Sequence, residues 1–81
     1  MLDMPVFESW AQYTRAAREF IPRALDYDET WTQAAIAGLL GVDPNYISMV
    51  ERGDREPGKQ YQLTLGYLIQ MARNGIDPRS A

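Results

Sequence analysis

The chain has 81 residues, 46% of them apolar, so we expect a single domain over residues 1–81 with one modest core. It contains no Cys and no His, which excludes disulfide frameworks, zinc fingers, Cys nucleophiles and Ser-His-Asp triads, so we expect no enzyme, metal site or cofactor. The net charge of −3 argues against a generic nucleic-acid binder, because neutralising phosphates supplies most sequence-independent affinity.

No apolar run is long enough to span a membrane. Residues 1–7 carry Asp3 and no basic residue, which is the wrong charge for the start of a secretory signal. We therefore expect a cytoplasmic protein.

Residues 7–21 carry the apolar spacing of an amphipathic helix. The residues on its apolar face are Phe7, Trp10, Ala11, Thr14, Ala17 and Ile21. Pro22 removes a backbone donor, so the helix either ends at Ile21 or kinks and continues through Leu25. Residues 26–30 are polar and predict a loop. The cations expected on solvated surface, with contact to phosphate as the alternative, are Arg15, Arg18 and Arg23.

Two short helices joined by a tight turn are predicted next. Thr32 can cap the first helix, and Gly41 ends it where the backbone must turn left-handed. Asp43 caps the second helix, whose first position suits Pro44. The pattern over residues 32–53 predicts a helix-turn-helix unit. Its inward-facing positions are Ile36, Ala37, Leu40, Val42, Ile47 and Val50.

A last helix is predicted over residues 60–73, and it is apolar on two faces. One stripe, sufficient for a core, contains Tyr61, Leu65, Leu68 and Ala72. A second stripe is left over and contains Leu63, Tyr67 and Met71. Because Gly66 between them would let another backbone approach, we expect a homodimer through this helix, helped by Ile69 and Ile76. The alternative is that the N-terminal segment covers the second stripe.

The helix-turn-helix segment resembles the Cro and phage-repressor (XRE-type) family. The matching features are Thr32-Gln33, Ala37, Leu40-Gly41-Val42, Ile47-Ser48, Glu51-Arg52-Gly53 and Pro57. The resemblance implies an all-α fold, a small lambda-repressor-like bundle of four to five helices. It also implies a small regulator of a phage or mobile element, of the kind encoded beside anti-CRISPR genes, with an antitoxin as the alternative.

In that family the second helix enters the major groove of double-stranded DNA. The residues that the resemblance implies as base readers are Asn45, Tyr46, Ser48, Met49 and Arg52. Asn45 suits adenine, and Arg52 suits guanine or phosphate. Met49 or Tyr46 could contact a thymine methyl group. The implied contacts to the DNA backbone are Thr32, Gln33, Arg55 and Lys59, although Gln33 could instead brace the second helix.

Several residues also have plainer interpretations. A carboxylate beside the groove would repel phosphate, so we expect Glu51 to pair with an Arg inside the protein, and Asp43 to act only as a cap. Trp10 and Trp31 are expected to pack in the core or at a corner of the fold. The GxxxxGK pattern that ends at Lys59 lacks the Ser or Thr and the preceding strand of a P-loop.

The predicted function is a sequence-specific DNA-binding transcriptional regulator, a homodimeric repressor of its own operon that binds an inverted repeat. The alternative is a protein-interaction or inhibitor module on a helix-turn-helix scaffold that binds a basic partner rather than DNA. The acidic charge favours the alternative, since a fold does not dictate a function.

Overall fold

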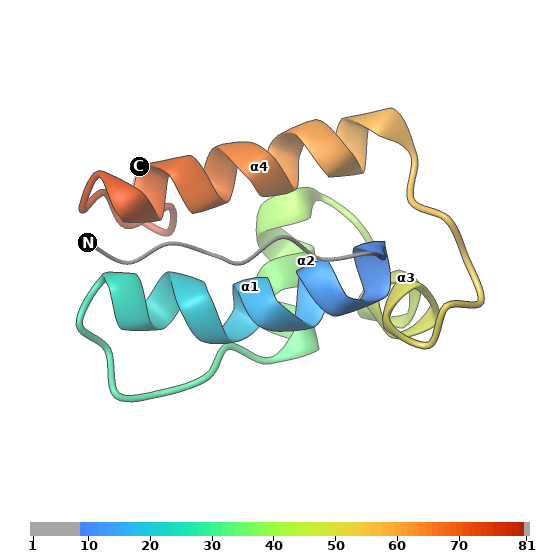
Figure 1. The fold of residues 1–81 in the computed structure, drawn as a ribbon, viewed down its shortest axis with the longest axis horizontal. Coiled ribbons are helices and arrows are strands. Elements are labelled where there is room, and N and C mark those ends of the chain that lie inside the picture. Colours follow the sequence, from blue (N-terminus) through green and yellow to red (C-terminus); the bar gives the residue numbers. More distant parts are fainter. Residues whose placement is uncertain (1–8, 81) are drawn as a thin grey trace.

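The computed structural model describes residues 9–80, and the regular elements within them are all helices. They are α1 (Trp10–Ala24), α2 (Gln33–Leu40), α3 (Pro44–Glu51) and α4 (Lys59–Arg73). Helices α1 and α4 lie side by side and run in the same direction, while α2 runs across them and α3 packs against α1 (Figure 1). The all-α prediction is confirmed, but the first helix begins at Trp10 rather than at Phe7, because Ser9 is extended and caps it.

Helix α1 continues past Pro22 and ends at Ala24, so the longer of the two predicted helices is correct. A proline cannot donate to the carbonyl four residues earlier, which here belongs to Arg18. The N–H of Trp31 donates to that carbonyl instead, at 2.9 Å. The loop before α2 thus returns to α1 and supplies the hydrogen bond that Pro22 cannot.

The two helices of the helix-turn-helix unit begin after the predicted caps, and α2 ends at the predicted Gly41. Thr32 accepts a hydrogen bond from the N–H of Ala35 at 3.1 Å, and Asp43 accepts one from the N–H of Asn45 at 2.8 Å. Gly41 has a φ of 72°, the left-handed conformation that glycine adopts without steric cost. These local bonds fix where α3 begins relative to α2.

The core is formed by side chains from all four helices and from Trp31. Its members are Ala17, Ile21, Trp31, Ile36, Ala37, Leu40, Ile47, Val50, Tyr61, Leu65, Leu68, Ile69 and Ala72. The predicted inward positions of the helix-turn-helix unit are therefore buried, except that Val42 is half-buried. The hydroxyls of Thr14 and Tyr61 share a buried hydrogen bond of 2.7 Å, and burial raises the pKa of Tyr61.

Helix α4 separates its two apolar stripes as predicted. The core stripe is buried, whereas Leu63 and Tyr67 are 63% and 67% exposed. Met71 is half-buried. The expectation that Ile69 helps a dimer is wrong, because Ile69 is 3% exposed and belongs to the core. The alternative that the N-terminal segment covers the second stripe lies outside the described residues.

The segment after α4 folds back onto the loop before α2. The guanidinium of Arg79 lies 5.0 Å from the ring centre of Tyr27 and 4.8 Å from that of Trp31. The Tyr27 hydroxyl donates to Asp77 at 2.7 Å. This bond is the largest cause of a raised pKa at Tyr27 and of a lowered pKa at Asp77.

Candidate nucleic-acid interface

Helix α3 has one side in the core and one side toward solvent. Ile47 and Val50 face inward and are almost completely buried. The outward residues, three, four and seven positions apart, share one face, and we call them the outer face of α3: Asn45, Ser48, Met49 and Arg52. The two end members of this face are exposed and the two middle members are half-buried.

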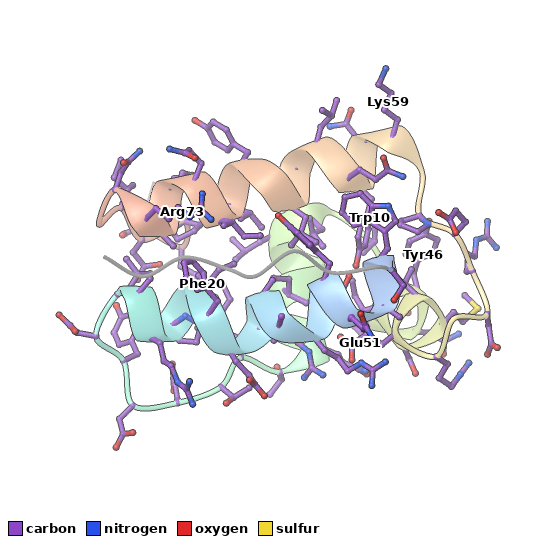
Figure 2. All side chains as sticks on the ribbon, in the orientation of Figure 1. Trp10, Phe20, Tyr46, Glu51, Lys59 and Arg73 are labelled. Atoms are coloured by element: carbon purple, nitrogen blue, oxygen red, sulfur yellow. The ribbon has the colours of Figure 1, made fainter. Side chains whose placement is uncertain are left out.

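Tyr46, the fifth predicted base reader, is bound to the loop between α3 and α4 and to α4 itself. Its ring centre lies 5.8 Å from that of Tyr61, and its hydroxyl accepts a hydrogen bond from the N–H of Gly58 at 3.4 Å. The Arg55 guanidinium lies 5.3 Å from the Tyr46 ring centre. Figure 2 shows Tyr46 where α3 meets this loop. The partners of Tyr46 are 9 to 15 residues further along the chain, so the local sequence pattern did not reveal these contacts.

Arg52 is the only cation on the outer face of α3. Its Nε donates to Asp54 at 2.9 Å, and one terminal nitrogen donates to the Ser48 hydroxyl at 3.2 Å. The side chains of the ion pair are 58% and 60% exposed. An exposed pair of this kind contributes about 0–1 kcal/mol, so a phosphate or base can displace Asp54 at little cost.

Glu51, the preceding residue, is held inside the protein. Its carboxylate accepts two hydrogen bonds from Arg18, at 2.9 and 2.7 Å, and a third from the Gln33 amide at 3.2 Å. Only 6% of its side chain is exposed. The expected internal pair with an Arg is confirmed, and it links α1, α2 and α3. Through this bond Gln33 braces α3, which is the alternative that the sequence left open for it.

Two cations of α1 converge on the end of α3. Arg18 also donates to the Trp31 carbonyl at 3.3 Å, and Arg15 donates to the Glu51 carbonyl at 2.8 Å. The prediction that Arg18 is solvated is wrong: its side chain is 20% exposed, because it neutralises a buried carboxylate. The spacing of three residues between the two arginines, which puts both on one helix face, was the available signal.

The remaining backbone candidates precede α2 or follow α3 along the chain. Thr32 is exposed, with its hydroxyl engaged as a cap. Arg55 and Lys59 are exposed, and Lys59 points away from the molecule at the start of α4 (Figure 2).

Charge around this face is balanced rather than acidic. In sequence, residues 43–59 hold three cations and four carboxylates. Because Glu51 is turned inward onto Arg18, three cations and three carboxylates are left toward solvent. The negative net charge of the chain is therefore a weaker argument against DNA binding at this face.

Two other kinds of site have no support in residues 9–80. No three of their acidic side chains gather in a group that could hold a metal ion. None of their helices combines the length and apolar character needed to cross a membrane.

Two short helices, a left-handed glycine turn and a second helix with a polar outer face define a helix-turn-helix domain. Residues 28–61 match a family model described as helix-turn-helix, of the Cro/C1 type in the XRE family. The match spans α2, α3 and the beginning of α4, and it indicates a DNA-binding regulatory domain. No curated protein and no solved structure matches the chain.

Proposed function

We propose that the protein is a sequence-specific transcriptional regulator that inserts α3 into the major groove of its operator and represses its own operon. The observation that carries this proposal is that α3 has one side fixed inside the protein and one side facing solvent. The Glu51 ion pair and the core hold its inner side, and four groups that suit contacts to DNA bases or phosphates occupy its outer face. The family match supports DNA binding by this segment.

Phosphate contacts would come from exposed residues before α2 and after α3. The proposed residues are Thr32, Arg55 and Lys59, together with Gln33 through the second N–H of the amide that donates to Glu51. With balanced charge at this surface, non-specific binding should be weak, and sequence-specific contacts should supply a larger share of the affinity. The predicted cytoplasmic location follows from this role, and an association with a phage operon stays a prediction.

A homodimer through α4 would supply a second reading helix. Leu63 and Tyr67 are the most exposed large apolar side chains of the described residues, and Met71 continues their stripe. A Cβ added to Gly66 would meet nothing within 4 Å, so the monomer does not need glycine there. A second copy of the chain that approached α4 closely would need glycine at this position, because any side chain would hold the two backbones apart. Two-fold symmetry implies an inverted-repeat operator with half-sites about one helical turn apart.

The dimer is tested by sedimentation velocity on matched variants. Tyr67→Ala should weaken self-association, whereas Tyr27→Ala, which removes an exposed tyrosine from the loop before α2, should leave it unchanged. Gly66→Ala should stabilise the folded monomer by about 0.5–1 kcal/mol, since glycine disfavours a helix interior, yet weaken self-association. If wild type and Tyr67→Ala sediment identically as monomers, the α4 dimer is wrong.

The DNA-binding proposal is tested by selecting bound sequences from random duplex DNA at moderate salt. We expect recovery of an inverted repeat, with affinity that falls steeply as salt rises. Arg52→Ala and Asn45→Ala should weaken binding to the selected duplex while circular dichroism shows an intact fold. Recovery of no preferred sequence, or unchanged binding by both variants, would contradict the proposal.

A second candidate function is a module that binds a basic partner. The observation in its favour is the acidic loop before α2, where Asp26, Asp28 and Glu29 are all exposed. It predicts that an arginine-rich peptide binds in the concentration range where random DNA does not. Binding that is lost on substitution of these carboxylates, together with an empty DNA selection, would favour this candidate.

A further inference from the structure

The outer face of α3 carries an unusual set of groups for reading DNA. Within Pro44–Glu51 there is no cation, and the outward groups are an amide, a hydroxyl and a thioether. Resting on the proposed DNA-binding function, we infer that this face selects A·T base pairs, with Asn45 contacting an adenine and Met49 a thymine methyl group.

Asn45 lies at the position of α3 that contacts bases, and its side-chain amide is free to do so. It is the second residue of α3, and the N-terminal residues of a reading helix are those that contact base edges. Its backbone N–H is fixed by Asp43 at 2.8 Å, whereas its exposed side-chain amide has no hydrogen bond within the described residues. An amide offers a donor and an acceptor side by side, which matches N7 and N6 of adenine.

Met49 lies one helical turn beyond Asn45 on the same face. Its thioether carries no hydrogen-bond donor, so it suits an apolar contact. Tyr46, the other candidate for a methyl contact, is held by Gly58 and Arg55. Met49 is therefore the one apolar side chain of the outer face, and the C5-methyl of thymine is the apolar group in the major groove.

Guanine is the base that this face is least equipped to read. Its usual partner is an Arg or Lys that donates twice to O6 and N7. Arg52 is the only such group and lies seven residues after Asn45, about 10 Å further along the helix axis. Two of its nitrogens donate to Asp54 and Ser48. We place Arg52 at a phosphate, where it adds affinity without base preference.

The test compares the binding of the full chain to duplexes with defined base changes, using fluorescence anisotropy. The reference is the duplex recovered by selection. One variant duplex replaces the A·T pairs of the half-sites by G·C, and another replaces thymidine by 2′-deoxyuridine, which removes only the methyl group. We expect about 5- to 150-fold weaker binding per lost adenine contact and about fourfold weaker binding per lost methyl contact.

Protein variants assign each preference to a side chain. Asn45→Ala should abolish the preference for adenine, while Asn74→Ala, a substitution of the chain's other asparagine at the far end of α4, should keep it. Met49→Ala should bind thymidine and deoxyuridine duplexes equally, and Met49→Leu should retain the difference. Arg52→Ala should weaken binding to all duplexes by the same factor.

The outcomes separate this inference from the proposed function. A selected operator that is G·C-rich, or equal binding to the thymidine and deoxyuridine duplexes by wild type, overturns the A·T inference and leaves DNA binding intact. A selection that recovers no sequence overturns the proposed function and the inference together.

Discussion

Glu51 and Arg52 are neighbours in sequence, and each forms an ion pair, yet the two pairs differ in almost every physical respect. The Arg18–Glu51 pair has side chains 20% and 6% exposed, and it joins three helices. The Arg52–Asp54 pair has side chains 58% and 60% exposed, and it joins residues two apart. Burial, rather than charge, separates a residue that holds α3 in place from one that is available to a ligand.

The largest expected effect comes from breaking the buried pair. Glu51→Ala should lower the free energy of unfolding by about 3 kcal/mol, because it leaves the partly buried Arg18 without its charge partner. Asp54→Ala is the matched control and should cost about 0–1 kcal/mol. Urea unfolding followed by circular dichroism measures both variants. Equal losses would show that the two pairs do not differ as described.

A smaller effect is expected on DNA affinity from the exposed pair. Asp54→Ala should tighten DNA binding by about 1.5- to 5-fold, because it frees Arg52 from an exposed pair and removes a charge that repels phosphate. Asp28→Ala, which removes an exposed carboxylate from the loop before α2, is the matched control. Anisotropy titrations at two salt concentrations measure the change. Weaker binding by Asp54→Ala would mean instead that Asp54 positions Arg52.

The smallest effect concerns pH and the exposed Tyr27–Asp77 contact. Because the pKa of Asp77 is lowered, its contribution to stability is present above the ordinary carboxyl pKa of 3.8 and is lost as pH falls through the lowered value. Because the pKa of Tyr27 is raised, its contribution is present below the ordinary 10.0 and is lost as pH rises through the raised value.

Asp77→Ala tests this contact directly. The substitution should return the pKa of Tyr27 toward 10.0, as followed by NMR titration of the ring carbon that bears the hydroxyl. The pKa of Tyr61, which burial raises, is the internal control and should stay unchanged. If the Tyr27 titration is the same in both proteins, the contact does not persist in solution.

Local signals made the helix-turn-helix unit predictable from sequence. Thr32 and Asp43 cap α2 and α3 because the oxygen of a short side chain can reach a backbone N–H two or three residues further on. Gly41 turns because its φ of 72° is strained for other residues. The period of buried residues then fixed which sides of the helices face the core.

Long-range partners were not predictable in the same way. Nothing in the local pattern showed that Trp31 would occupy the carbonyl freed by Pro22, or that Tyr46 would pack against Tyr61. An internal partner for Glu51 was expected from chemistry, but the choice of Arg18 depends on how α1 crosses α3.

An NMR titration distinguishes an α3 whose outer face contacts DNA, while its inner side only supports it, from an α3 that does not contact DNA. The isotope-labelled chain is titrated with the duplex recovered by selection, and amide shift changes are mapped onto the structure. This role of α3 predicts that the largest changes cluster at residues 32–33 and 45–52. Changes centred on the acidic loop, residues 26–30, with none in α3, would contradict it.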